Sequence, residues 1–137
     1  MSKLRELKIV CPYAIMVKQG GSNKNALNLN VYKGQHYISQ NNTKKKFKFM
    51  VRDQLKGIEL ETPVEITYQI FKPRKNRLDK MNLLSIQSKY LLDALSEYEV
   101  WPDDNDEYVK TETLLPTLHD KDNPRVEVVF KTIKVDL

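Results

Sequence analysis

The sequence has little cysteine and histidine, and this narrows the chemistry that it can perform. A single cysteine, Cys11, excludes an intramolecular disulfide and any cysteine-rich zinc site. The two histidines, His36 and His119, are far apart and show no metal-ligand spacing, which argues against a zinc enzyme or a histidine-based triad. Because Cys11 lies in an apolar stretch, we expect a buried and unreactive thiol.

Long hydrophobic runs are also missing. No apolar segment approaches the roughly 18 residues that are needed to span a bilayer, and residues 1–12 lack the length and the small-residue cleavage site of a signal peptide. We therefore expect an intracellular, cytoplasmic protein with no membrane partner. The chain has 137 residues, 40% of them hydrophobic and 30% charged. Residues 1–137 are therefore expected to form one soluble globular domain.

Positive charge is in modest excess and is unevenly distributed. The formal net charge is +5 and the isoelectric point is about 9.2, which suits a polyanionic partner, although a solvated basic surface would give the same total. A first basic cluster contains Lys44, Lys45, Lys46 and Lys48. A second contains Lys72, Arg74, Lys75 and Arg77. The second cluster leads directly into a segment rich in acidic residues.

Hydrophobic periodicity predicts the secondary structure in the order β–α–β–α–β–β. Strands are expected over residues 6–17 (interrupted by Pro12), 63–71, 108–115 and 125–134, helices over 39–56 and 79–97, and loop over 18–35. The strand at 63–71 alternates cleanly between apolar and polar positions. This order predicts a single α/β (α+β) domain in which two main helices pack on a mixed β-sheet.

The helix predicted over residues 79–97 carries a polar stripe. At about 100° per residue, roughly 80° of arc contains Asp79, Asn82, Ile86, Lys89 and Asp93. The opposite side is expected to carry Met81, Leu84, Leu91, Leu92 and Leu95. A partly enclosed row with two carboxylates indicates a functional site. The alternative is a surface ion pair between Lys89 and Asp93, with Asp79 acting only as the helix N-cap.

The loop after this helix adds further carboxylates. Asp103 and Asp104 are adjacent, with Asp106 and Glu107 just beyond them. Adjacent carboxylates repel one another unless water or a cation neutralises them, so the alternatives are a solvated acidic surface and a metal site. Oxygen ligands from two segments, together with a lysine, predict a Mg²⁺ site, with Mn²⁺ as an alternative ion. Such an ion activates water and stabilises the leaving oxygen in phosphodiester hydrolysis.

The same segment resembles the signature of the RusA family of Holliday-junction resolvases, in its phage or prophage form. The matching elements are Asp79-x-x-Asn82, Lys89-x-x-x-Asp93-Ala94-Leu95 and Trp101-x-Asp103-Asp104, and the spacing from the second to the third element matches closely. The resemblance extends weakly to residues 27–37 and 120–128. Two departures stand out. First, Met81 occupies the position of the family's second early aspartate. Second, the segment from Asn82 to Asp93 is about four residues longer than in the family, so Ser85 stands where the family has its lysine. Four residues are close to one helical turn, so Lys89 lies on the same face of the helix.

The resemblance implies a Mg²⁺-dependent endodeoxyribonuclease that resolves four-way junctions in recombination, repair or phage DNA processing. Carried over by position, the catalytic residues would be Asp79, Lys89, Asp103 and Asp104. Asp79 and Asp104 would be metal ligands assisted by Asp93 and Asp103, and Lys89 would stabilise developing negative charge or position the phosphate. For Asp93 the alternative is a structural anchor between the helix and the next loop. Met81 implies a reduced or altered metal site.

The expected partner is branched DNA. Phosphate contacts are predicted for Lys44, Lys45, Lys46, Arg74, Lys75 and Arg77, with Arg74 and Arg77 favoured because they lie within a few residues of Asp79. Tyr32, His36 and Tyr37 would stack on or wedge between bases, or else pack in the core. Because a four-way junction has two-fold symmetry and is cut twice, a homodimer is expected. Two other hypotheses are a non-catalytic DNA-binding protein of the same fold and an RNA-binding module, although the latter lacks an aromatic RNP motif.

Overall fold

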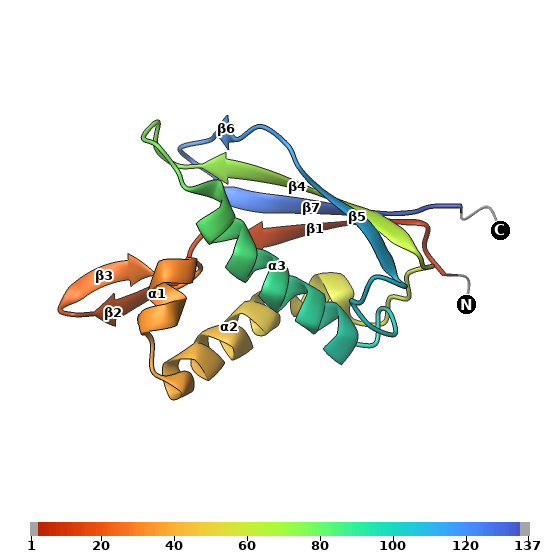
Figure 1. Ribbon diagram of the computed structural model, residues 1–137, viewed down its shortest axis with the longest axis horizontal. Coiled ribbons are helices and arrows are strands. Elements are labelled where there is room, and N and C mark those ends of the chain that lie inside the picture. Colours follow the sequence, from red (N-terminus) through yellow and green to blue (C-terminus); the bar gives the residue numbers. More distant parts are fainter. Residues whose placement is uncertain (1–2, 135–137) are drawn as a thin grey trace.

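The protein forms one five-stranded mixed sheet with its helices packed on one side (Figure 1). The computed structural model describes residues 3–134. Its elements are β1 (Glu6–Pro12), β2 (Met16–Gln19), β3 (Ser22–Asn25), α1 (Leu29–Gly34), α2 (Tyr37–Leu55), β4 (Val64–Lys72), α3 (Lys80–Glu97), β5 (Val109–Leu114), β6 (Leu118–His119) and β7 (Arg125–Thr132). Strands β2 and β3 form a separate hairpin. The predicted α+β class is therefore confirmed.

The strand order of the sheet is β1-β7-β4-β5, and β6 continues beside β4 beyond the end of β5. Strand β7 is antiparallel to both of its neighbours, with Ile9 opposite Val128 and Phe130 opposite Ile66. Strands β4 and β5 are parallel, so their connection must cross over the sheet, and α3 provides that crossover. This βαβ unit brings the loop after α3 back to the start of β5.

The core lies between the sheet and the two long helices. Alternate residues of β1, β4 and β7 point toward the helices, as period-two alternation requires, and they pack against Phe47, Val51 and Leu55 of α2 and the apolar face of α3. Cys11 is among them at 1% exposure, and burial raises the pKa of its thiol. The expectation that Cys11 is buried is thus confirmed.

Most predicted elements are confirmed with small shifts at their ends, but the N-terminal region differs. The strand expected over 6–17 is divided, because β1 ends at Pro12 and β2 begins at Met16. The loop expected over 18–35 contains the end of β2 and the whole of β3 and α1. Gly20 and Gly21 have φ values of 60° and 80° and form the tight turn of the hairpin. The hairpin strands contain few apolar residues, so alternation gave little sign of them. The two-residue β6 also lies where a polar loop was expected.

The rotation predicted for α3 needs correction at two positions. Met81, which was assigned to the apolar side, is 60% exposed, whereas Ile86, which was placed in the polar stripe, is 1% exposed. The reason is that α3 contacts α2 as well as the sheet, so its buried surface is broader than one stripe. The rings of Phe47 on α2 and Tyr90 on α3 lie 5.8 Å apart at this contact.

Candidate metal site and nucleic-acid surface

Asp79 is the N-cap residue of α3, so the structural role considered for it is confirmed. Its Oδ1 accepts a hydrogen bond from the Asn82 backbone N–H at 3.3 Å, and its Oδ2 accepts one from the Asn82 side-chain amide at 2.9 Å. The side chain thereby satisfies one of the free N–H groups at the helix start. The Asp79-x-x-Asn82 pair of the motif therefore acts as a capping unit.

The structure does not bring Asp79 together with the other predicted carboxylates. Asp79 and Asp93 are separated by almost four turns of α3, which corresponds to about 21 Å along the axis at ~1.5 Å per residue. Asp103 and Asp104 follow the far end of the same helix. The acidic residues thus form one group near the end of α3, and Asp79 stands apart from it.

The group at the end of α3 consists of Asp93, Asp103 and Asp104. Asp103 accepts hydrogen bonds from the Asp104 backbone N–H at 2.8 Å and from the Asn105 side-chain amide at 3.1 Å. The backbone bond, above all, lowers the pKa of Asp103. Desolvation, followed by the neighbouring carboxyl group of Asp103 and the negative charge of Asp93, raises the pKa of Asp104. Two carboxyls that compete for a proton are well placed to share a cation instead.

The ligand set available to a metal is small. Among residues 3–134, no three histidine, cysteine or acidic side chains are gathered closely enough to form a preformed metal cage. Mg²⁺ does not require one, because it is often held by one or two carboxylates and keeps several waters for substrate phosphates. The Asp103–Asp104 pair fits that requirement, with Asp93 adding charge nearby.

Lysines of α2 pair with acidic residues of α3. The Nζ of Lys44 lies 2.6 Å from Oδ2 of Asp93, and Lys48 forms an ion pair with Glu97. The surface pair between Lys89 and Asp93 that the helical spacing allowed is not among the ion pairs of the described residues; Asp93 instead connects α3 to α2. Lys89 is exposed one turn before Asp93. The Lys44–Asp93 pair could not be predicted from the sequence, because it joins two helices whose relative position depends on the whole fold.

The acidic loop is anchored in the core by Trp101. This side chain is 4% exposed, its ring packs edge-to-face on Phe130 with centroids 5.7 Å apart, and its indole N–H donates to Ser96 Oγ at 3.0 Å. Asn105 then closes the loop, because its side chain accepts a hydrogen bond from the Glu107 N–H. Asp103 and Asp104 are thus held between two fixed points.

The basic residues before α3 lie on an exposed loop. Arg74, Lys75 and Arg77 are exposed and are absent from the ion pairs of the described residues. Lys72 instead shapes the loop by donating from Nζ to the Asn76 carbonyl at 2.8 Å. These three predicted phosphate contacts are therefore available to a ligand, as are the exposed Lys45 and Lys46 of α2, which also form no ion pair among the described residues, whereas Lys44 is already paired.

The β2–β3 hairpin lines a groove beside each basic segment. A groove of about 660 Å³ lies between Arg74 and the hairpin residues Asn23 and Asn25. A second, of about 350 Å³, is lined by Lys46 and by Lys18 of β2. Sequence reasoning missed Lys18 because the hairpin itself was missed; the Gly20-Gly21 turn between polar residues was the available signal.

The three aromatic candidates have different roles. Tyr32 packs edge-to-face on Tyr90, with ring centroids 6.4 Å apart, so the core-packing alternative is confirmed for it. His36 is the N-cap of α2, where its Nδ1 accepts from the Ile38 N–H at 3.3 Å. Tyr37 is 65% exposed and lies against the His36 ring at 4.5 Å. Tyr37 and its neighbour His36 are both exposed, whereas Tyr32 is half-buried.

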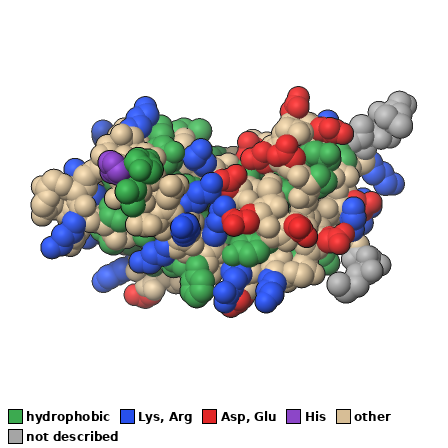
Figure 2. Space-filling model, turned by 90° about the horizontal axis from the view of Figure 1, so that it is seen from below, with side chains coloured by type: hydrophobic (Ala, Val, Ile, Leu, Met, Phe, Trp, Pro, Cys, Tyr) green, Lys and Arg blue, Asp and Glu red, His purple; other side chains and the backbone are tan. Residues whose placement is uncertain are grey.

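Charge is segregated over the helix side of the molecule. Figure 2, which views this side, shows acidic side chains gathered toward one end and lysines and arginines over the middle and the other end. The acidic end corresponds to the loop after α3, and the basic part to the region of α2 and the hairpin (Figure 1). The acidic side chains therefore lie beside the basic part of this side of the molecule.

No family model matches the sequence, and no curated protein matches it. The similarity to RusA resolvases therefore depends on the motif residues alone. Over residues 3–134, no helix is both long enough and apolar enough to cross a membrane.

The exposure of Met81 leads to a prediction about Met81→Asp. The first turn of α3 contains no acidic residue, and a carboxylate there interacts favourably with the helix dipole by about 0.3–1 kcal/mol. The variant should therefore fold with a stability within about 1 kcal/mol of the wild type, measured by urea denaturation. Met81→Asn is the uncharged control. Loss of several kcal/mol in Met81→Asp alone would contradict the exposed position of Met81.

Proposed function

We propose that this protein is a Mg²⁺-dependent, structure-selective endodeoxyribonuclease that acts on four-way junctions and other branched DNA. The observation that carries the proposal is the pair Asp103–Asp104, joined by the hydrogen bond from the Asp104 backbone N–H to Asp103 Oδ1, in the loop that follows α3. Figure 2 shows acidic side chains gathered beside a basic surface on this side of the molecule. The RusA-like motif supports the proposal because it contains these three residues. Cleavage in recombination, repair or phage DNA processing is the corresponding role.

Asp103 and Asp104 would hold the ion, and Asp93 would add negative charge that raises its local concentration. When bound, Mg²⁺ activates a water molecule and stabilises the leaving oxygen of the phosphodiester. Lys89, exposed one turn before Asp93, would approach the scissile phosphate and stabilise the developing negative charge. Asp79 would contribute by fixing the start of α3 and, through it, the direction of the basic loop before the helix.

DNA would contact the basic segments on either side of the hairpin. Lys45 and Lys46 of α2 and Arg74, Lys75 and Arg77 would bind phosphates, and Tyr37 would stack on an unpaired base at the branch. Two-fold symmetry of a four-way junction makes a homodimer the fitting assembly, since each protomer would then cut one strand.

The direct test is incubation with a synthetic four-way junction in the presence of EDTA, Mg²⁺ or Mn²⁺. We expect paired nicks near the branch point with either metal, and none with EDTA. Linear duplex of the same sequence is the control for structure selectivity. Binding of junctions without cleavage at any concentration of either metal would overturn the enzymatic proposal.

A second candidate is a non-catalytic DNA-binding protein of the same fold. The observation that favours it is the distance of Asp79 from the acidic group, together with Met81 at the position of a family carboxylate. Such a protein would bind branched DNA with the same basic residues and would show no metal-dependent step. The junction assay separates the two candidates because both require binding and only one requires cleavage.

Removal of Arg74 and Arg77 should weaken DNA binding in a salt-dependent way. Each lost phosphate contact lowers the slope of log Kobs against log salt by about 0.9 for duplex DNA, so the double alanine variant should lose about 2 units of slope. Fluorescence anisotropy over a range of salt concentrations measures it. Lys131→Ala, which removes an exposed lysine on the opposite side of the sheet, is the matched control and should leave the slope unchanged. An unchanged slope in the double variant would place the DNA elsewhere.

A further inference from the structure

The groove between the β2–β3 hairpin and the start of α2 (the α2 groove) is large enough for a small ligand. Its volume of about 350 Å³ lies at the lower end of the range of such sites, roughly 300–1,000 Å³. Residues 15–19 form one wall and α2 forms the other, and Figure 1 shows the hairpin beside α1 and the N-terminal end of α2. Among residues 3–134, no aspartate or glutamate lines this groove, so an anionic ligand would meet no carboxylate in it.

The α2 wall of the groove presents a row of polar side chains. Ser39, Asn42 and Lys46 line the groove and recur at a spacing of three to four residues, which places them on the same side of the helix. All three are exposed. Behind them Thr43 is 3% exposed, and its hydroxyl donates to the Ser39 carbonyl at 3.0 Å. The row therefore offers a hydroxyl, an amide and an ammonium group to a ligand.

The opposite wall combines apolar surface with a second lysine. Residues 15–17 line it, and Met16 is 57% exposed. Lys18 follows them, and neither Lys18 nor Lys46 forms an ion pair among the described residues. Gln35 also lines the groove, and its Oε1 is buried without a hydrogen-bond partner in residues 3–134. A buried acceptor normally has a donor, and rotation of this amide toward the groove would let a ligand supply one.

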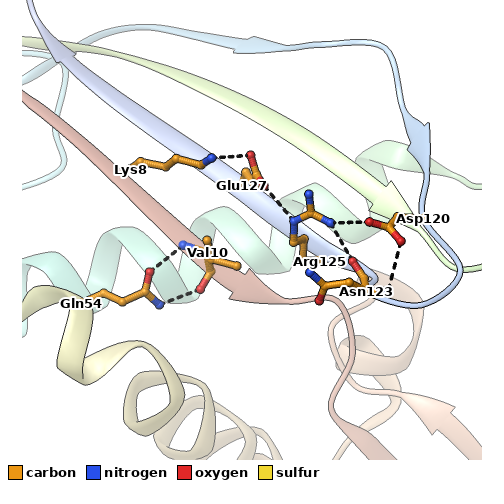
Figure 3. A network of polar contacts seen from close by, with 7 residues as sticks. All are labelled: Lys8, Val10, Gln54, Asp120, Asn123, Arg125 and Glu127. Carbon is orange, nitrogen blue, oxygen red and sulfur yellow. Dashed lines mark hydrogen bonds and ion pairs between the residues drawn. The ribbon is translucent and has the colours of Figure 1, made fainter.

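The open face of the sheet also carries cations, but they are already paired. Glu127 bonds Lys8 at 2.9 Å and Arg125 at 2.8 Å, and Arg125 also bonds Asp120 at 2.9 Å (Figure 3). An anion would have to displace this network. The two lysines of the α2 groove have no such partners among the described residues, so the groove is the better site for a phosphate.

We propose that the α2 groove binds one unpaired nucleotide of branched DNA. Lys18 and Lys46 would hold its phosphate, and its base would lie against the apolar surface of residues 15–17. The polar edge of the base would meet the amides of Gln35 and Asn42, which can both donate and accept hydrogen bonds. The inference rests on the proposed function, because it names the part of the branched substrate that the protein would recognise.

A site for a single base favours branched DNA over fully paired duplex. Within a duplex each base is stacked and paired, and extruding it costs free energy that an already unpaired nucleotide does not require. A well-placed contact between a side-chain amide and a base edge changes affinity by about 5–150-fold. The groove would therefore contribute to structure selectivity through binding, independently of the acidic residues after α3.

Three duplexes that differ at one position test the inference. The first is fully paired, the second carries a single-nucleotide bulge, and the third has an abasic site in place of the bulged nucleotide. The abasic duplex keeps the phosphates of the bulge and lacks the base. Fluorescence anisotropy in EDTA should show that the bulged duplex binds most tightly, by at least about fivefold over the abasic one. Equal affinity for the bulged and abasic duplexes would overturn the proposal.

Asn42→Leu and its matched control Asn41→Leu locate the site. Both replace an exposed asparagine of α2 with a better helix former, so both variants should fold, as circular dichroism can check. Asn42 lines the groove, whereas Asn41 lies about 100° further round the helix and is not among the lining residues. Asn42→Leu should lower the ratio of bulged to abasic affinity by about fivefold or more, and Asn41→Leu should leave it unchanged. Loss of the ratio in both variants, or in neither, would place the base elsewhere.

A free nucleotide is the other source of the same chemistry. A deoxynucleoside monophosphate should displace the bulged duplex only at a large molar excess, because it lacks the neighbouring phosphates of the DNA. Binding of the monophosphate as tightly as the bulged duplex would assign the groove to a free nucleotide and overturn the proposal. All these readouts are binding in EDTA. A protein that cuts junctions but does not distinguish the bulged from the abasic duplex would therefore contradict this inference alone, and one that distinguishes them but never cuts would contradict the nuclease alone.

Discussion

Asp104→Asn should abolish junction cleavage while leaving junction binding intact or slightly tighter. The substitution keeps the shape of the side chain and removes the charge that would hold the metal. Loss of even an outer-shell partner costs about 10–100-fold in metal affinity or activity, so loss of a direct ligand should reduce cleavage by at least about 100-fold. Binding should persist because the removed charge repels phosphate. Single-turnover nicking and anisotropy of the same junction separate the two effects.

The variant should also fold normally, which makes its loss of activity interpretable. Because the pKa of Asp104 is raised in the folded protein, its ionised form is less favourable there than in the unfolded chain. The carboxyl therefore lowers stability at pH values above its folded pKa, and that effect diminishes as the pH falls toward and below this pKa. Asp104→Asn should thus be at least as stable as the wild type at pH 7, with a small gain because the loop is largely exposed.

Asp106→Asn is the matched control for Asp104. It removes the same charge from the same exposed loop but lies outside the hydrogen-bonded pair, so its cleavage rate should stay close to that of the wild type. Wild-type cleavage by Asp104→Asn would remove Asp104 from the metal site. Equal loss in both variants would indicate that the total charge of the loop, and not a specific ligand, controls activity.

The sheet and the long helices could be predicted because their signals are local. In strand β4, buried residues alternate with more exposed ones from Val64 to Phe71. Helices α2 and α3 carry apolar residues at helical spacing, and Asp79 caps the start of α3. The β2–β3 hairpin could not be predicted in this way, because it buries little. It is held instead by contacts such as those of the Asn25 side chain, which accepts a hydrogen bond from the Ile15 N–H and donates one to the Tyr13 carbonyl. These bonds connect positions that no periodic pattern relates.

The residues of the candidate site were predictable, but their arrangement was not. Adjacent carboxylates at 103 and 104 are visible in the sequence, and a helix of known length predicts that Asp79 and Asp93 lie far apart. The motif nevertheless suggested one cluster, because a motif records order along the chain and not distance. The Lys44–Asp93 pair and the exposure of Met81 depend on how α2 packs against α3, which periodicity of α3 alone does not define.

This arrangement makes the acidic loop depend on a single buried anchor. Residues 102–107 are exposed, and they are joined to the core through Trp101 on one side and to β5 on the other. Since the carboxylates of Asp103 and Asp104 must converge to share a cation, any freedom at the anchor would separate them. Stability of the core and affinity for the metal are therefore expected to be coupled through Trp101.

Trp101→Ala should be the most destabilising of the substitutions considered. Truncation of a buried Trp to Ala typically costs about 3–5 kcal/mol, and here it also removes the edge contact with Phe130 and leaves Ser96 Oγ without its donor. The free energy of unfolding from urea denaturation measures the loss. In the folded fraction, the loosened loop should raise the Mg²⁺ concentration needed for half-maximal cleavage.

Trp101→Phe is the conservative control: it keeps an aromatic ring against Phe130 and loses the hydrogen bond, so a cost of about 1–2 kcal/mol is expected. Because that variant should remain folded, it tests the coupling even if Trp101→Ala does not fold. A Trp101→Phe protein with reduced stability and an unchanged metal requirement would show that the loop is held by its other contacts.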